Sequence, residues 1–312
     1  MSTNNVVDVE AEAADMCCAS CGIAAVDNIN LMDCDSCDLV RYCSDKCQQE
    51  HRPQHGEICK ERAAELRDEI LFRQPESTHL GDCPICCLPL PIEMNGSSWY
   101  TCCSTMVCDG CAYANRLRQL RQRLPSVCPF CRHPVRTTDE DHKNDLKRAA
   151  ANDPAALYNI GSKHHDEGDY EVAFEYWTKS AEFGNVIAHY ELSGLYHKGN
   201  GVEKDLEKEI YHLEEAAIAG DPRARFRLGY IEVRGERFDR AVKHLIIAAN
   251  LGHDNSIQML KSCYTSGAAS KEDFAAALRA HHAAVEAMKS PQRELASKTR
   301  NEYEAKTRNV GI

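Results

Sequence analysis

Paired cysteines constrain this chain more than any other feature. All but one of its 18 cysteines lie between Cys17 and Cys131. Two cysteines separated by two or three residues can turn both thiolates toward one metal ion, with zinc–sulfur bonds of about 2.3 Å. The pairs are Cys18 and Cys21, Cys34 and Cys37, Cys43 and Cys47, Cys83 and Cys86, Cys108 and Cys111, and Cys128 and Cys131. Two pairs close one tetrahedral site, so the pattern predicts several structural zinc sites.

The same cysteines would form disulfides in a secreted protein. Residues 1–16 are acidic and lack the apolar core of a secretion signal, and we expect them to be a disordered tail. No run of residues approaches the ~18 apolar residues that a membrane span needs. We therefore expect a cytoplasmic or nuclear protein without membrane partners, in which zinc is favoured over disulfides.

Composition limits the classes of fold and partner. A chain of 312 residues is long enough for two or three domains. The 43% hydrophobic and 27% charged residues are typical of folded proteins. A net charge of −11 lacks the basic footprint of general nucleic-acid binding, so we do not expect a nucleic-acid partner.

Residues 17–59 form the first predicted zinc module. Eight ligand-type residues make two closed sites, which leave no open position for catalysis and would supply on the order of 10 kcal/mol of folding energy per ion. Cys17 could replace Cys18, and His51 could replace His55, although the spacing favours Cys18 and His55. The predicted ligands are Cys18, Cys21, Cys34, Cys37, Cys43, Cys47, His55 and Cys59.

This string of ligands closely resembles the MYND zinc finger over its whole length. The resemblance implies interleaved ligands, in which Cys18, Cys21, Cys43 and Cys47 bind one zinc ion and the other four residues bind the second. It also implies a protein-interaction module that often binds proline-containing peptides. Many members carry a tryptophan shortly before the last histidine, where this chain has His51, Arg52 and Pro53. We therefore expect its peptide groove to differ.

Residues 60–80 are predicted to be a helical linker. The stretch from Lys60 is rich in helix-forming residues, with a weak apolar stripe at Leu66 and Ile70. Pro75 is expected to end the helix. We interpret this as a short helix that separates two zinc modules.

Residues 81–136 form the second predicted zinc module. Asn95 and Gly96 predict the turn of a β-hairpin. Leucines recur at helical spacing up to Leu124, where Pro125 stops the pattern. The predicted ligands are Cys83, Cys86, Cys102, Cys103, Cys108, Cys111, Cys128 and Cys131.

The order of these elements resembles a RING domain over about 50 residues, because the module begins Cys-Pro-Ile-Cys and ends Cys-Pro-Phe-Cys-Arg. The resemblance implies that Cys83, Cys86, Cys108 and Cys111 bind one zinc ion and the other four cysteines bind the second. It also implies that Ile85 and Pro129 contact a ubiquitin-conjugating enzyme and that Arg132 contacts ubiquitin. The usual histidine ligand is missing, since position 105 is threonine, and Cys103 takes its place as in all-cysteine variants.

The sequence does not decide one ligand of the second zinc site in this module. Side chains of neighbouring residues diverge in an extended chain, so Cys102 and Cys103 on one ion would be strained. Either of them, or His133, could be the fourth ligand, and Cys87 is expected to be spare.

Six arginines and no acidic residue lie between Arg116 and Arg136. They could form a docking face for an acidic partner. We favour the simpler interpretation, in which they are the solvated side of the helix opposite its leucines.

Residues 140–290 contain an internal repeat. Ile160, Leu192, Leu228 and Leu260 recur after 32, 36 and 32 residues. A glycine also recurs near the expected end of each second helix, at positions 184, 220 and 252. Periods near 34 residues are typical of stacked helical hairpins with a concave face.

The repeat resembles the tetratricopeptide class and specifically SEL-like repeats, which implies a scaffold for protein complexes. Residues 253–289 diverge, as a capping unit does, and residues 291–312 are expected to be a polar helical or frayed tail. The predicted fold is thus multidomain: two small zinc modules, MYND and RING-like, precede an all-α solenoid of helical hairpins.

These features predict a modular, zinc-binding protein-interaction protein with about four zinc ions. Its partners would be peptides bound by the MYND finger and the repeat groove. In one version it is a RING-type ubiquitin ligase that lacks its own nucleophile; in the other it is a non-catalytic adaptor. A MYND-containing methyltransferase would need a large β-rich domain, and a metal hydrolase would need an open coordination position, so neither class is expected.

Overall fold

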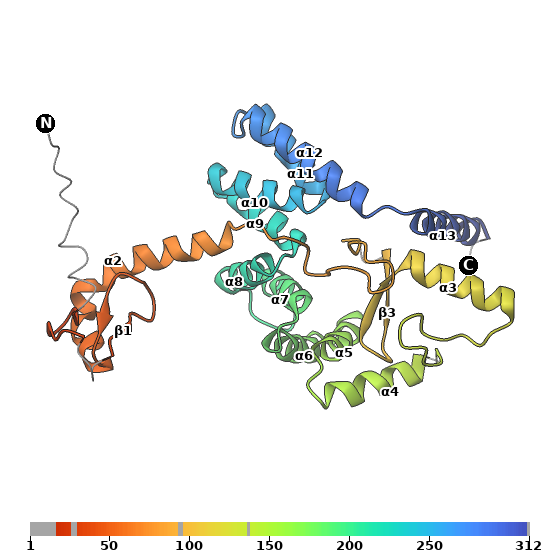
Figure 1. Ribbon diagram of the computed structural model, residues 1–312, viewed down its shortest axis with the longest axis horizontal. Coiled ribbons are helices and arrows are strands. Elements are labelled where there is room, and N and C mark those ends of the chain that lie inside the picture. The colour runs from red at the N-terminus through yellow and green to blue at the C-terminus, as the bar shows by residue number, and fades with distance from the viewer. Residues whose placement is uncertain (1–16, 26–29, 93–95, 136–137, 311–312) are drawn as a thin grey trace, which may run out of the picture. The chain divides into compact units, whose positions relative to one another are not determined.

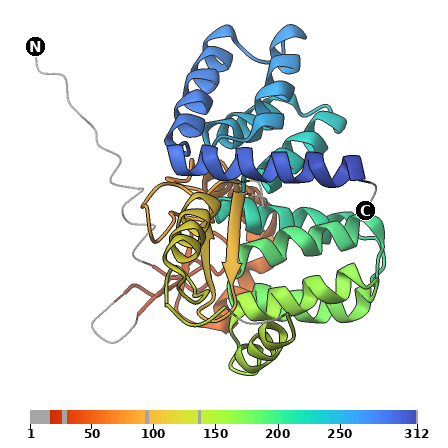
Figure 2. The same ribbon diagram turned by 90° about the vertical axis from the view of Figure 1, so that its right-hand side faces the viewer.

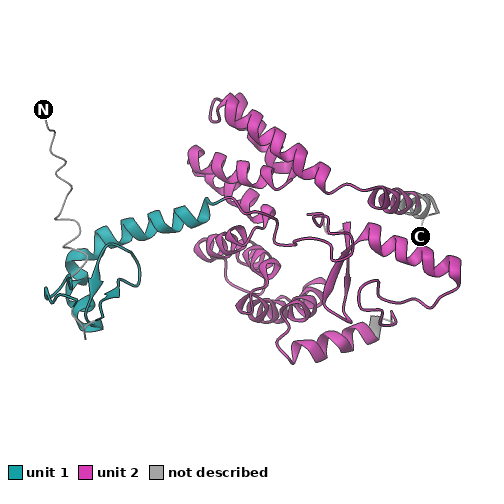
Figure 3. Cartoon of the chain, viewed as in Figure 1, with its two compact units in different colours: residues 1–73 teal, residues 74–312 magenta. Residues whose placement is uncertain are grey.

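A computed structural model describes residues 17–25, 30–92, 96–135 and 138–310 (Figure 1). The expected acidic tail, residues 1–16, lies outside the described residues. The chain divides into two compact units, Met1–Arg73 and Gln74–Ile312 (Figure 3). The boundary follows the first zinc module and the helix that extends from it.

The described residues of the first unit form only a small hydrophobic core. Strands β1 (Met32–Asp33) and β2 (Arg41–Tyr42) pair antiparallel, with Met32 opposite Tyr42. Tyr42 is buried among cysteine sulfurs, and the same cluster includes Cys18, Cys34, Cys37 and Cys47. So small a core cannot offset the conformational entropy lost on folding, so metal binding must stabilise this unit.

Helix α2 (Asp45–Leu71) is one continuous helix of 27 residues. It begins at Ser44, whose hydroxyl accepts a hydrogen bond from the Cys47 N–H. The helix predicted within residues 60–80 is present, but it is the second half of α2 and not a short helix of its own. Because the ligand-bearing segment is itself helical, the helix formers after Lys60 extend the same helix to Leu71, where it ends before Pro75.

The second zinc module contains a hairpin and a helix. Strand β3 (Ser97–Tyr100) pairs antiparallel with β4 (Thr105–Cys108), and α3 (Asp109–Gln122) follows. The turn of this hairpin is residues 101–104, whereas we predicted Asn95 and Gly96. Asn95 lies outside the described residues, and Gly96 directly precedes β3.

Ten helices complete the described part of the second unit, and the repeat helices stack in chain order (Figure 2). The repeat leucines are buried as the period predicts, with Leu192 and Leu260 fully enclosed. The helices are α4 (Thr138–Ala149), α5 (Pro154–Asp166), α6 (Tyr170–Glu182), α7 (Val186–Lys198), α8 (Leu206–Ile218), α9 (Pro222–Arg234), α10 (Phe238–Asn250), α11 (Asp254–Thr265), α12 (Lys271–Ala287) and α13 (Pro291–Val310). None of the described helices is both long enough and apolar enough to cross a membrane.

The second zinc module and the repeats share direct contacts. The His79 N–H donates to the Gly220 carbonyl at 3.1 Å, just before the zinc module begins. At the other end of the module, the Ser104 hydroxyl lies 3.0 Å from the carboxylate of Asp153, the residue that caps α5. The two predicted domains therefore fold as one compact unit.

Helix α13 packs along α3 of the zinc module (Figure 1). Arg300 forms an ion pair with Asp109 at 2.9 Å, and the Thr299 hydroxyl donates to the Tyr113 hydroxyl at 3.2 Å. The described part of the predicted tail is thus a packed helix rather than a frayed end. Its polar side chains are used for hydrogen bonds to the zinc module.

Gly220 combines two requirements that only glycine meets, and this generates the first prediction. Its φ is +92°, and a Cβ atom would lie 2.9 Å from the Ser77 carbonyl oxygen. Gly220→Ala is expected to destabilise the second unit by about 2 kcal/mol, because it adds backbone strain and a contact with the main chain. The midpoint of denaturant unfolding, followed by helical circular dichroism, measures the loss.

Gly194→Ala is the matched control. This glycine lies inside α7, and a Cβ atom there would meet nothing within 4 Å. Alanine is expected to raise stability by up to about 1 kcal/mol. Equal effects of the two substitutions would contradict the proposed contact at Gly220.

Candidate metal centres

The described residues contain four groups of ligand atoms, and within each group all atoms lie within 4.8 Å of one another. They comprise fifteen cysteine sulfurs and one histidine nitrogen, the donors that zinc prefers. The groups are Cys18, Cys21, Cys43 and Cys47; Cys34, Cys37, His55 and Cys59; Cys83, Cys86, Cys108 and Cys111; and Cys102, Cys103, Cys128 and Cys131.

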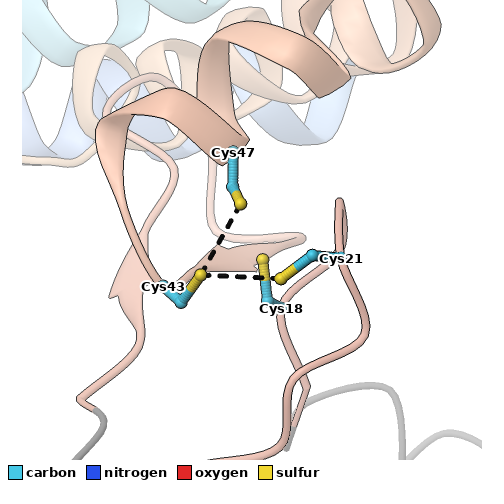
Figure 4. Close-up of side chains that lie close together, drawn as sticks. All are labelled: Cys18, Cys21, Cys43 and Cys47. Carbon is cyan, nitrogen blue, oxygen red and sulfur yellow. Dashed lines mark hydrogen bonds between the residues drawn. The ribbon is translucent and has the colours of Figure 1, made fainter.

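The first group joins a loop to the start of α2 (Figure 4). Cys43 directly follows β2, and Cys47 lies in the first turn of α2. The Cys43 sulfur is 3.6 Å from the sulfurs of both Cys21 and Cys47. A regular zinc tetrahedron with 2.3 Å bonds has sulfurs roughly 3.8 Å apart, so the spacing fits zinc.

The second group uses two residues one turn apart on α2. His55 and Cys59 share a helix face, and the buried His55 Nε2 lies 3.2 Å from the Cys37 sulfur. His51, the alternative ligand, is outside the group. Its Nδ1 is 3.0 Å from the Tyr42 hydroxyl, and its ring stacks on that of His55. Cys17 also lies outside the four groups.

The third group joins a loop to α3. The Cys86 and Cys108 sulfurs are 3.7 Å apart. Cys108 directly precedes α3 and Cys111 lies in its first turn, so the start of the helix fixes both positions. The site therefore ties the start of the module to the helix that follows the hairpin.

The fourth group contains Cys102 and Cys103, the adjacent cysteines whose role as ligands the sequence did not decide. The Cys102 sulfur is 3.5 Å from that of Cys131, and the Cys103 sulfur is 3.9 Å from that of Cys128. Both lie in the hairpin turn, next to Ser104 with φ +48°. The expected strain does not arise, because the chain turns here instead of running extended. His133 is outside the group.

Three of the Cys-x-x-Cys loops repeat one backbone arrangement. In each, the N–H four residues after the first cysteine donates to that cysteine's carbonyl. The bonds are Gly22 to Cys18 at 2.8 Å, Cys87 to Cys83 at 2.8 Å and Arg132 to Cys128 at 3.1 Å. The donor residue has a positive φ in every case: 73° at Gly22, 54° at Cys87 and 64° at Arg132. Cys87, expected to be spare, thus holds a backbone position that Gly22 marks in the first loop.

The first cysteines of two loops have unusually acidic thiols. Burial alone would raise the pKa of Cys18, but backbone N–H groups, first that of Cys21, lower it to about 6. The pKa of Cys83 is likewise raised by burial and lowered by backbone N–H groups to about 7. By contrast, hydrogen bonding to Cys47 and Cys21 raises the pKa of Cys43 to about 12. Zinc must displace protons from such thiols when it binds.

The predicted partner-binding residues lie around one cavity. Ile85, Pro129 and Arg132 line a space of about 450 Å³, together with Arg118 and Gln292. The Ile85 side chain is 42% exposed. The three residues come from two loops of the same backbone form, which brings positions distant in sequence to one cavity, although Pro129 itself is buried.

The predicted apolar stripe is buried only in part, since Tyr113 and Leu117 of α3 are half-buried and the two later leucines are exposed. Leu120 is 67% exposed and Leu124 is 45% exposed, while Gln119 is buried. The Gln119 amide donates to the Val127 carbonyl, which holds the following loop. Arg116, Arg118, Arg121, Arg123 and Arg132 are exposed as well, and Arg136 lies outside the described residues. The surface of this helix is therefore both basic and apolar.

Comparisons with protein families match two parts of the chain. The MYND finger model matches residues 18–59, and the Sel1 repeat model matches residues 154–185, 186–221 and 222–253. The chain thus carries a MYND finger followed by Sel1 repeats. These matches and the four ligand groups confirm the predicted fold class and the prediction of about four zinc ions.

Two curated relatives resemble parts of the chain. The DAP3-binding cell death enhancer 1 of Mus musculus is 25% identical over 175 residues, covering 43% of this chain and 34% of the relative. The putative beta-lactamase HcpC of Helicobacter pylori is 36% identical over 59 residues, covering 19% of this chain and 20% of the relative. The chain therefore spans about a third and a fifth of these relatives' lengths.

Two solved structures are similar. A Sel1 repeat protein from Oxalobacter formigenes is 26% identical with a TM-score of 0.40, over 51% of this chain and 68% of that chain. A protective antigen of uropathogenic Escherichia coli with an SLR fold is 19% identical with a TM-score of 0.40, over 61% of this chain and 40% of that chain.

Since MYND fingers and Sel1 repeats generally mediate protein–protein interaction, the matched families support a zinc-binding interaction adaptor.

The acidic thiols generate a prediction about pH. The low pKa values of Cys18, about 6, and Cys83, about 7, leave both thiolates free for zinc at pH 8. As the pH falls through 7 to 6 they take up protons, which compete with the metal. Zinc affinity is expected to fall by about ten-fold per pH unit wherever a high-pKa thiol such as Cys43 must lose its proton, and to fall more steeply below about pH 7, where Cys83 and then Cys18 also take up protons. Competition with a chromophoric chelator measures the affinity, and a slope that stays the same from pH 8 to pH 6 would contradict the low pKa values.

The left-handed backbone conformation of Cys87, directly after the Cys83–Cys86 loop, generates another prediction. Cys87→Gly is expected to keep four zinc ions per chain and to raise thermal stability by up to about 1 kcal/mol, because it relieves the strain at φ +54°. Cys87→Val is expected to lower it, since a β-branched side chain fits this conformation poorly. Metal analysis and the thermal midpoint are the measurements.

Cys17→Gly is the control for loss of a thiol outside the four groups. Cys17 forms an antiparallel bridge with Ala24, so glycine there relieves no left-handed strain. It is expected to leave stability unchanged or slightly lower. A similar gain at both positions would show that removing a free thiol, and not the backbone conformation, is responsible.

Proposed function

We propose that this protein is a RING-type ubiquitin ligase whose Sel1 repeats recruit the substrate. The observation that carries the proposal is the cavity lined by Ile85, Pro129 and Arg132 on the second zinc module. On neighbouring zinc loops, the exposed Ile85 offers a small apolar contact for a conjugating enzyme, while Pro129 lines the same cavity but is itself buried. An arginine at the edge of that contact offers a hydrogen-bond donor to ubiquitin.

The proposed mechanism needs no nucleophile from this chain. The conjugating enzyme brings a ubiquitin thioester, and the ligase holds it close to a substrate lysine, so that the reaction becomes effectively unimolecular. Ile85 and Pro129 would bind the enzyme, while Arg132 would restrict the mobility of the attached ubiquitin. The zinc ions would keep these loops rigid and take no part in bond making.

The surface of α3 supports a protein partner at this end of the module. Leu120 in α3 and Leu124, two residues after the helix ends, are both exposed, and so are Arg121 and Arg123. Contiguous exposed apolar patches commonly mark interaction sites, and a partner here would cover both leucines. The partner that fits is a protein with an apolar patch and acidic neighbours.

Substrate recruitment is assigned to the repeats and the MYND finger. Both families bind protein segments, and two repeat aromatics, Tyr211 and Tyr230, are about half exposed and available for such contacts. The proposal also requires a reducing compartment, cytoplasm or nucleus, where thiols stay available to zinc.

A non-catalytic adaptor is the second candidate. Ser290 and Gln292 line the same cavity as Ile85 and leave less room for a partner. Thr105 also stands where a RING domain usually has a histidine ligand. In this version the second zinc module only binds a protein partner or stabilises the helices packed against it.

Self-ubiquitination of the purified, zinc-loaded chain with a panel of conjugating enzymes tests the proposal. The parent is expected to form ubiquitin ladders, and Ile85→Ala is expected to reduce their rate at least ten-fold with unchanged zinc content. Arg132→Gln should slow ubiquitin transfer while leaving enzyme binding intact. Ile70→Ala is the matched control, since Ile70 is a similarly exposed isoleucine, 46% against 42%, on α2 of the first unit.

The two candidates give different outcomes. No ladder from any conjugating enzyme, with a parent that holds four zinc ions, would leave only the adaptor. Equal loss in Ile85→Ala and Ile70→Ala would assign the activity to some other surface.

A further inference from the structure

Arg293, in the first turn of α13, contacts the loop that follows the zinc ligand Cys86. Its Nη1 donates to the carbonyls of Pro89 and Met288, both at 2.7 Å. Its Nη2 donates to the Leu88 carbonyl at 3.2 Å and to the Cys86 sulfur at 3.6 Å. One guanidinium therefore donates to the sulfur of the ligand Cys86 and also to the carbonyls of Leu88 and Pro89 in the loop that follows it.

The backbone of α13 also passes directly against the third ligand group. Gly110 lies between the ligands Cys108 and Cys111, and a Cβ atom there would be 2.8 Å from the Arg293 nitrogen and 3.0 Å from the Gln292 carbonyl carbon. No side chain fits in this space. The contact depends on a glycine at this position between two ligands.

Electrostatics favours a cation at this site. Four thiolates around one divalent ion leave a net charge of −2 at a partly buried position. A guanidinium that donates to one sulfur offsets part of this charge. Groups that hydrogen-bond to metal ligands in this way fix the ligand's orientation and tune the affinity for the metal.

We propose that Arg293 is a positioning residue for the zinc site of Cys83, Cys86, Cys108 and Cys111. It fixes the Cys86–Pro89 loop and hydrogen-bonds to one zinc thiolate. Helix α13 is thereby part of the second zinc module, although Arg293 and Cys86 are 207 residues apart in the sequence. This inference goes beyond the proposed ligase function and does not depend on it.

Zinc release from the full chain tests the proposal. Arg293→Met keeps the apolar stem and removes every donor. One of the four zinc ions is expected to pass to a chromophoric chelator about ten-fold faster than in the parent, at the low end of the effect of removing a metal ligand's hydrogen-bond partner. The other three ions are expected to keep their parental release rates.

Arg300→Met is the matched control on the same helix. It removes the ion pair with Asp109, which also joins α13 to α3, but it does not touch a sulfur. Parental zinc release from Arg300→Met, with one labile ion in Arg293→Met, would support the proposal. Equal release from the two variants would overturn it, because helix docking alone would then explain the effect.

Cobalt substitution gives a readout that a purely structural role would not change. Removing a hydrogen bond from a thiolate makes the sulfur a stronger electron donor. The thiolate-to-cobalt charge-transfer absorption of Arg293→Met is therefore expected to shift to longer wavelength relative to the parent and to Arg300→Met. Identical cobalt spectra for all three proteins would overturn the proposed contact with the Cys86 sulfur.

Discussion

The zinc–thiolate bond is the interaction on which both small modules depend. Three of the four sites join a loop to a helix, as Cys18 and Cys47 show in the first unit and Cys83 and Cys111 in the second, and the fourth joins the hairpin turn to a loop. Little else holds them together: the buried core of the second module, apart from its cysteines, consists chiefly of Leu90 and Val107. The metal therefore replaces the hydrophobic core that segments of this length cannot build. The repeats need no metal, because each helical hairpin buries its leucines against the next.

Local spacing was enough to predict most of the ligands and the repeats. The pair spacing named twelve of the fifteen cysteines that the structure brings together in four groups, and His55, Cys59, Cys102 and Cys103 completed the predicted set. The interleaving was implied by resemblance to known families, since spacing alone does not say which pairs share an ion. The period of the repeat located Ile160, Leu192, Leu228 and Leu260, all of which are buried. Both kinds of signal are short-range patterns that recur many times, so a single sequence is enough to recognise them.

The features that sequence reasoning missed depend on contacts between distant segments. Asn95 and Gly96 are a strong turn signal, but the hairpin turns at Cys102 and Cys103, because both sulfurs must reach Cys128 and Cys131. The spacing of Leu120 and Leu124 predicted a helix correctly and gave no information about burial. The docking of α13 was hidden for another reason. It relies on a guanidinium, main-chain carbonyls and Gly110, and not on an apolar stripe that could be recognised.

The contact between Arg293 and Cys86 can form only late in the synthesis of the chain. Ribosomes add about 5–20 residues per second, so the 207 residues between them take roughly 10–40 s to synthesise. During that interval the ligands Cys83, Cys86, Cys108 and Cys111 are already available, but the helix that braces them is not. A nascent chain would thus hold its third zinc ion in a looser site that tightens only after the repeats have been made. Chains interrupted within the repeats would keep that looser site.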